Sequence, residues 1–437
     1  MTHLPSSTRH EPPPNKPPRF RSMPDTTKPT PQGTTRAAHY AAWILACTTF
    51  PLIWMGGLVT TYAAGMAVPD WPSTYGYNLF LYPLESWLQV WDVFLEHGHR
   101  LLGSVVGIAT IVLAILLWRR DTRPTMWWVA GIALAGVCLQ GVLGGLRVVG
   151  SKIFDTEIAW MPAPVFLTIA AAALVFLVQA IPPGAAGRRK LGFWIRAAIV
   201  SGLFAALAWF GIAAVEDRLF LAKVHGCTAP AFFALAAGTV VATSPRWVES
   251  SQPTETPFAT RLQCLTTLAA GAIYLQIILG ANLRHIAPNA APWWFTLWIW
   301  LHVIVACGIV LLILWLFVTA RRHTPNEPLL RRRISLLAGL FAFQLLLGVT
   351  TWVTNYGWPL WFTENILAVE YTVVAESLWQ ALSTTAHVGV GSLCLATATS
   401  AALWSQRLLK FPSASPPPRA DKYRNTPTGQ SKRNRRQ

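Results

Sequence analysis

Residues 96–120 of the chain read EHGHRLLGSVVGIATIVLAILLWRR. The stretch opens on a short polar group, continues as an almost uninterrupted apolar run and closes on two arginines. A helical run of roughly twenty apolar residues crosses a hydrocarbon core of about 30 Å. Arginines directly after such a run are typical of its cytoplasmic end. Residues 97–118 are therefore predicted to form a transmembrane helix.

The rest of the chain follows the same pattern. Of its 437 residues, 53% are hydrophobic and 12% are charged, which is too little charge to cover a soluble domain. Many of the 22 Trp residues stand where apolar runs end, as Trp does at headgroup level. An all-α polytopic membrane protein is expected, with ten spanning helices near residues 41–62, 97–118, 125–147, 160–181, 191–214, 222–243, 262–283, 295–319, 334–354 and 380–404.

The basic residues predict the orientation. Arg and Lys cluster in every second link between apolar runs and in both tails, so both termini are predicted to be cytoplasmic. Most of the net charge of +17 lies in the tails, residues 1–37 and 405–437, which are rich in Pro or polar residues and expected to be disordered. Basic tails beside a membrane mark its cytoplasmic side, and we exclude nucleic acid as a partner. No cleavable signal peptide is expected, because a polar segment precedes the first run.

A weak repeat occurs in the helices that run outward. Gln140 is followed four residues later by Gly144, and the same spacing recurs at Gln276 with Gly280 and at Gln344 with Gly348. The first helix carries a degenerate copy that ends at Gly56. Small residues at such positions let helices approach closely, or they make room for a flat ligand. The sequence leaves both interpretations open.

Four of the ten histidines fall in equivalent places. His99, His225, His302 and His387 each lie in the first third of an inward-running helix, near the outer face. Ionisable residues inside a membrane are costly and are functional candidates by default. Two imidazoles on facing helices can fill both axial positions of a haem iron. Chain order suggests the pairs His99 with His225 and His302 with His387.

Further candidates surround these histidines. Glu96 shares a helical face with His99 and with Arg100, so it could stand beside the first pair, and Arg100 could bind it or a haem propionate. Arg147 and Arg284, at the outer ends of repeat helices, are candidates for propionates or for lipid headgroups. Gln140, Gln276 and Gln344 are candidates for the same role or for support of the ligands. Two links rich in Trp, Tyr and Pro, residues 63–96 and 355–379, resemble interfacial lids.

The ordered set of motifs resembles the haem A synthase family, which serves cytochrome oxidase assembly. The resemblance covers residues from about 45 to 400 and includes Gly56-Gly57, Pro69-Asp70-Trp71-Pro72, Glu96 with His99-Arg100, Gln140 to Gly145, Val224-His225-Gly226, Gln276 to Asn282, His302, and Gln344 to Gly348 with His387. It implies oxidation of a methyl group of haem O to a formyl group. It also implies haem B held by His302 and His387, substrate haem flanked by His99 and His225, and Glu96 as a catalytic residue.

The resemblance further implies two pseudo-symmetric four-helix bundles in a bacterial inner membrane. The expected organisation is a tail at 1–38, a first half at 39–243, a linker at 244–261, a second half at 262–404 and a tail at 405–437. Haem O synthase and oxidase assembly factors are the expected protein partners.

The chain departs from the family pattern in two places. Residues from about 149 to 218 add two apolar runs to the first half, which we expect to form a helical hairpin without haem ligands. Val68 and Thr74 stand where some members carry a cysteine pair, so thiol chemistry is not expected there.

Other classes of protein fit the sequence less well. A di-haem electron carrier of the cytochrome b kind would need ligands at two depths, whereas all four histidines lie near one side. A haem transporter or chaperone could use the same ligands without chemistry, although Glu96 beside His99 favours an enzyme. A prenyltransferase needs Asp-rich Mg²⁺ sites, and the sequence has no such pair in or near its helices. A secondary transporter is the remaining alternative.

Overall fold

The computed structural model describes residues 36–153, 218–249, 253–286, 290–357 and 377–412. All of them fall within one compact unit, residues 33–437. The tails expected at 1–38 and 405–437 lie mostly outside the described residues. So does the hairpin expected at about 149–218, except for its first five residues and its last one.

Eight described helices are long and apolar enough to cross a membrane. They are α1 (Arg36–Thr61), α3 (Trp91–Arg120), α4 (Pro124–Ile153), α7 (Arg218–Thr243), α9 (Ala259–Arg284), α10 (Pro292–His323), α11 (Pro328–Tyr356) and α13 (Leu378–Leu408). Each corresponds to one of the ten predicted spans, and the prediction of an all-α polytopic membrane protein is confirmed. The predicted spans at 160–181 and 191–214 lie outside the described residues.

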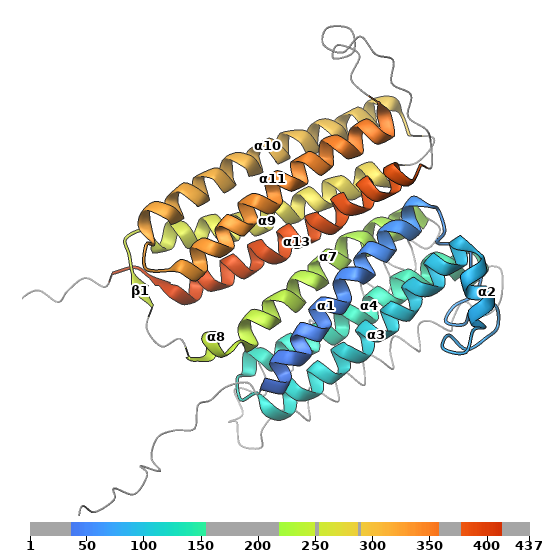
Figure 1. The fold of residues 1–437 in the computed structure, drawn as a ribbon, viewed down its shortest axis with the longest axis horizontal. Helices are drawn as coiled ribbons and strands as arrows, with labels where there is room; N and C mark the ends of the chain where they lie inside the picture. The colour runs from blue at the N-terminus through green and yellow to red at the C-terminus, as the bar shows by residue number, and fades with distance from the viewer. Residues whose placement is uncertain (1–35, 154–217, 250–252, 287–289, 358–376, 413–437) are drawn as a thin grey trace, which may run out of the picture. The chain divides into compact units, whose positions relative to one another are not determined.

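The eight long helices form two four-helix bundles (Figure 1). In the first bundle α1, α3, α4 and α7 pack in a closed ring, in which each helix contacts two others. In the second bundle α9, α10, α11 and α13 pack in the same cyclic order. The two bundles meet mainly through α13, which packs against both α1 and α7.

Each bundle has its own apolar core. Leu45, Leu113 and Leu117 are fully buried in the first core, and Leu262, Leu316 and Leu337 are fully buried in the second. Many large apolar side chains remain exposed on the outer faces of α3 and α10, as expected where helices meet lipid rather than water. The bundles are therefore held by internal packing, while the bilayer covers their outer surfaces.

Short elements lie at the two ends of the bundles. Helix α2 (Leu84–Gln89) precedes α3 in the loop that follows α1. At the opposite end are α8 (Pro245–Glu249) and a two-stranded parallel sheet of β1 (Thr254–Glu255) and β2 (Leu409–Lys410). The arginines that predicted the orientation, such as Arg120, Arg246 and Arg321, lie at this opposite end, which we call the basic end.

The predicted helix boundaries were wrong mainly at the N-termini. Helix α3 begins at Trp91 rather than near residue 97, and α11 begins at Pro328 rather than near 334. The helix continues before the predicted start, and the polar residues Glu96 and His97 near that start are buried within the bundle.

Candidate functional site

The four predicted histidines form two pairs, one in each bundle. His99 on α3 and His225 on α7 have ring centroids 6.3 Å apart, with ring planes inclined by 79°. His302 on α10 and His387 on α13 have centroids 6.3 Å apart, with planes inclined by 60°. The structure thus brings together the two pairs that chain order suggested. We call the end of the bundles that carries them the histidine end.

The separation of the rings matches axial ligation of one metal ion. Two metal–imidazole bonds of about 2 Å in line, with roughly 1.1 Å from each bonded nitrogen to its ring centre, place the ring centres roughly 6.3 Å apart. The described residues contain no group of three or more His, Cys, Asp or Glu that could hold a metal ion. Each pair therefore offers two ligands and leaves the other positions to a cofactor such as a porphyrin.

The repeat glycines make room for the histidine rings. A Cβ atom added at Gly56 would lie 2.9 Å from Cε1 of His99, and one added at Gly348 would lie 3.2 Å from Cε1 of His387. Gly144 faces His225 in the same way, and Gly280 faces His302. Each repeat helix thus supports the histidine of the next long described helix in the chain. At each of these glycines an imidazole of the neighbouring helix fills the space, which is a close helix contact of the kind considered from the sequence.

The repeat glutamines fix the backbone beside three of the histidines. Gln276 donates from Nε2 to the carbonyl oxygen of His302 at 2.9 Å, and Gln344 donates to that of His387 at 2.8 Å. Gln140 reaches the carbonyl oxygen of His225 at 3.4 Å and bonds Oγ1 of Thr228 at 2.6 Å. Through these main-chain bonds the glutamines support the candidate histidine ligands, which is one of the two roles considered for them from the sequence.

The Nδ1 atoms of the four histidines are buried within the bundles. Nδ1 of His99, His225, His302 and His387 makes no hydrogen bond of good geometry with a described residue, although main-chain groups of Leu52, Gln140 and Gln344 interact with the rings of His99, His225 and His387. An unpaired buried polar atom is unfavourable and uncommon in folded proteins, and it often marks a functional site. The same ring placement recurs at four equivalent positions, and together with the ring separation of 6.3 Å the residues present fit a haem held by two imidazoles.

We predict that a side chain at Gly348 disrupts the second pair. Gly348→Val places methyl groups where the His387 ring lies, so the ring must move, and haem affinity falls by about 10–100-fold. The matched control on the same helix is Gly339→Val, because a Cβ at Gly339 meets nothing within 4 Å. Haem titration of both purified variants measures the effect. Equal affinities would show that Gly348 is not needed for ligand placement.

The loop after α1 is fastened over the first bundle by Arg100 and Glu96. Arg100 Nη1 donates to the carbonyl oxygens of Asp70 and Ser73 at 2.7 and 2.8 Å, and Nη2 donates to that of Val68 at 3.1 Å. Glu96 accepts from the Val68 amide at 2.8 Å and forms an ion pair with Arg100 at 2.6 Å. Both carboxylate oxygens of Glu96 are therefore engaged, and no hydrogen bond joins Glu96 to His99.

The same loop places an indole ring against α4 of the first bundle. The ring of Trp71 lies on Gly145, where an added Cβ would be 2.6 Å from the indole. Gly145 is the neighbour of Gly144, which faces His225. Asp70 shapes the turn by accepting from Ser73, Tyr75 and Gly76. Burial acts to raise the pKa of Asp70, but these hydrogen bonds outweigh it and the pKa is lowered.

We predict that Arg100→Lys loosens this loop without unfolding the bundle. A lysine keeps the charge but cannot reproduce the fork of donors that reaches three carbonyl groups and Glu96. Hydrogen–deuterium exchange of residues 67–77 should rise about tenfold, because each charge-assisted hydrogen bond contributes to closure. Arg123→Lys at the basic end, where Arg123 pairs with Asp121, is the control and should leave the loop unchanged. Unchanged exchange in Arg100→Lys would contradict this role.

Other described histidines lie apart from the two pairs. His97 is buried and shares a hydrogen bond of 3.0 Å with Oγ1 of Thr74, so it helps to hold the loop. His323 stacks on Phe258 at the basic end, with ring centroids 3.4 Å apart. His285 directly follows α9 at the histidine end.

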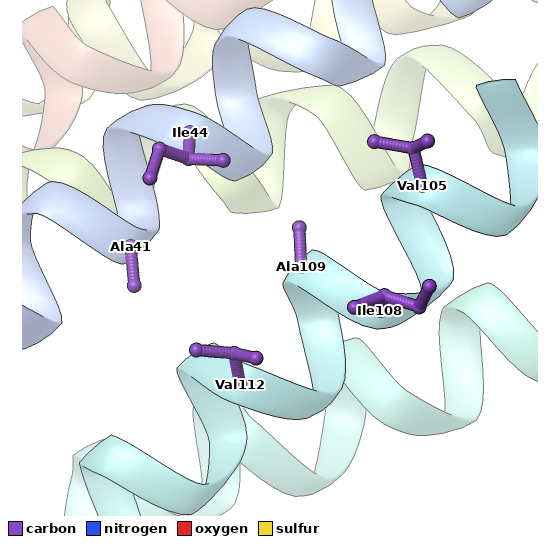
Figure 2. Close-up of a pocket in the computed structure, with 6 residues that line it drawn as sticks. All are labelled: Ala41, Ile44, Val105, Ile108, Ala109 and Val112. Carbon is purple, nitrogen blue, oxygen red and sulfur yellow. The ribbon is translucent and has the colours of Figure 1, made fainter.

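A groove elsewhere on the first bundle is lined by side chains without a polar or charged group. The groove between α1 and α3 has a volume of about 270 Å³ and is lined by aliphatic side chains alone, namely Ala41, Ile44, Val105, Ile108, Ala109 and Val112 (Figure 2). None of these side chains can bind a metal or transfer a proton. The groove fits hydrocarbon, and the candidate site remains at the histidine pairs.

Several contacts near the site were missed by the sequence interpretation. The ring of Trp71 on Gly145 and the bonds from Arg100 to loop carbonyls join segments far apart in the chain. In the sequence, these contacts were indicated only by the unusual Pro69-Asp70-Trp71-Pro72 stretch, which precedes a helix with polar residues near its start.

The fold and the site define a polytopic, all-helical membrane protein with a histidine pair in each of two bundles. Residues 39–160 match the family described as cytochrome oxidase assembly protein. A protein named Heme A synthase from Beijerinckia indica subsp. indica is 26% identical over 172 residues, covering 33% of this chain and 46% of that protein. A protein of the same name from Shouchella clausii is 32% identical over 96 residues, covering 22% of this chain and 30% of that protein.

Parts of the chain are thus similar to a cytochrome oxidase assembly family and to two proteins named Heme A synthase. The match spans about half the length of the first relative and about a third of the second.

Proposed function

We propose that this chain is a haem A synthase, an oxidoreductase that converts a methyl group of haem O to a formyl group. The observation that carries the proposal is the pair of imidazoles in each bundle at the separation of two axial ligands, 6.3 Å. The similarity to proteins named Heme A synthase supports the same reaction. Haem B bound by His302 and His387 would supply redox chemistry, and haem O would bind between His99 and His225.

The residues of the first bundle would hold the substrate and exclude water. Gly56 and Gly144 set the positions of His99 and His225, and Trp71 lies beside this pair against Gly145. Glu96 and Arg100 fasten the loop above it. In this proposal Glu96 is needed for the reaction, since it keeps the loop closed and holds a carboxylate close to the first pair.

The proposal also includes the cellular location and the orientation in the membrane. We propose a bacterial plasma membrane, with the basic end and both termini in the cytoplasm, because arginines gather at the basic end. Haem O synthase would supply the substrate, and factors of cytochrome oxidase assembly would receive the product.

The test is the identity of the haems in membranes that contain this chain together with a haem O synthase. Extracted haems are separated by chromatography, with a His99→Ala variant of the chain as the control. Haem A or its hydroxylated precursor should appear only with the unaltered chain. If bound haem B accumulates while haem O is unchanged, the chain is an electron carrier or haem-handling protein, and the oxidation reaction is withdrawn.

A further inference from the structure

Basic groups gather at the histidine end without a direct ion pair to a carboxylate. Arg147 lies near the end of α4, Arg284 ends α9, His285 follows it, and Lys223 lies near the start of α7. The ion pairs found among the described residues join Arg100 to Glu96 and Arg123 to Asp121, so none of these four groups takes part, although the Glu96 carboxylate acts electrostatically on Arg147. Half-buried cations without a direct ion pair are unfavourable, and such a cluster is suited to bind anions.

The guanidinium group of Arg284 connects the two bundles. It donates from Nη2 to the carbonyl oxygen of Gly57 at 2.8 Å and to Oγ1 of Thr61 at 2.6 Å. Gly57 adjoins Gly56, which faces His99 in the first bundle. One turn before Arg284 on its own helix, Gly280 faces His302 in the second bundle. Arg284 therefore joins the two bundles close to the glycines that face His99 and His302, and its Nη1 and Nε atoms have no hydrogen bond among the described residues.

Arg147 occupies the equivalent place in the first bundle. It stands one turn after Gly144, which faces His225. Its guanidinium packs against Gly65 in the loop after α1, where an added Cβ would be 3.2 Å from Cζ and from Nη2. No described residue accepts a hydrogen bond from it, although a guanidinium has five N–H donors. Its donors are available to a bound ligand.

The environment of His285 shows that these cations share one region. Burial, and then the positive charges of Arg284, Arg147 and Lys223, lower the pKa of His285 to about 4. At neutral pH the cluster therefore contains three positive charges and one neutral imidazole. The neutral ring can donate or accept a hydrogen bond without adding to the repulsion among the cations.

We infer that Arg147, Arg284, Lys223 and His285 form one carboxylate-binding centre, shared by the two bundles, that takes the propionate groups of the haems. The inference rests on the proposed function and goes beyond it in assigning a single centre to both sites. Each haem brings two carboxylates on one edge, and guanidinium groups bind carboxylates in a fork-like geometry. Propionates that point to this centre would fix which edge of each porphyrin enters the bundle.

The experiment compares haem B with its dimethyl ester, in which both carboxylates are capped. Each porphyrin is titrated into the full-length chain stripped of haem, and the absorbance spectrum reports ligation by the histidines. The unaltered chain should bind haem B about tenfold or more tightly than the ester. In a double variant, Arg147→Gln with Arg284→Gln, this preference should disappear. Arg261→Gln at the basic end is the matched control and should keep it.

Other outcomes decide against the inference. A preference for haem B that survives in the double variant would overturn it. Loss of co-purified phospholipid from the double variant, with the porphyrin preference unchanged, would show that the cations bind lipid phosphate instead, which also overturns it. Because Arg284→Gln removes the bond to Gly57, Lys223→Gln is tested alongside, and it should reduce the preference by about threefold while leaving α1 undisturbed. If neither porphyrin gives a bis-histidine spectrum, the proposed function fails and not the carboxylate centre alone.

Discussion

His302→Ala or His387→Ala is expected to remove tightly bound haem B from the purified chain. Each substitution would take away one of the two proposed axial ligands, whose rings lie 6.3 Å apart, and the remaining imidazole would not hold the iron alone at the same affinity. We expect the haem content to fall by at least tenfold, as measured by the absorbance of the extracted haem. By titration, His387→Ala should lower the haem affinity more than Gly348→Val does, because a ligand is lost rather than displaced.

A histidine at the basic end gives the matched control. His323 stacks on Phe258 and lies outside both pairs, so His323→Ala should keep the haem B of the unaltered chain. Unchanged haem content in His302→Ala and in His387→Ala would rule out this pair as the haem B site.

Glu96→Gln is expected to stop product formation while sparing haem B. The amide has nearly the same shape, but it lacks the charge that pairs with Arg100 and has one oxygen instead of two to accept hydrogen bonds. We expect conversion of haem O to fall by about 100-fold or more, within the range for loss of a group that handles protons. Haem chromatography after co-expression measures the product, and extraction of the purified variant measures haem B.

A second readout separates two roles of Glu96. If Glu96 only fastens the loop, Glu96→Gln and Arg100→Lys should raise hydrogen–deuterium exchange of residues 67–77 to the same extent and lower activity alike. If the carboxylate takes part in the chemistry, Glu96→Gln should lose far more activity than Arg100→Lys at equal exchange. An active Glu96→Gln variant would remove Glu96 from the mechanism.

The sequence predicted the fold well because a bilayer constrains it strongly. A run of apolar residues of spanning length has few alternatives to a transmembrane helix, and all eight long described helices were expected from such runs. The positions of His99, His225, His302 and His387 on these helices followed from the repeat, and their pairing followed from chain order. The helix starts were less predictable, because burial within a bundle allows a polar residue such as Glu96 to lie inside a helix.

The contacts that shape the candidate site depend on distances that a sequence does not contain. That Gly348 faces His387 requires the rotation of two helices about their axes, and the repeat fixed only the spacing within one helix. Arg284 was a candidate for a propionate, but its bond to Gly57 crosses between bundles whose relative placement had no local signal. Arg100 was considered as a partner of Glu96, whereas the three loop carbonyls that it also binds are main-chain atoms without any sequence signature.

The most direct test of paired-histidine ligation is near-infrared magnetic circular dichroism of the purified, full-length chain in the ferric state. The account predicts the charge-transfer band of low-spin haem with two imidazole ligands, its loss in His302→Ala, and a second such signal, sensitive to His99→Ala, when haem O is added. A high-spin spectrum in the unaltered chain, or a bis-imidazole band that survives in His302→Ala and His387→Ala, would contradict it.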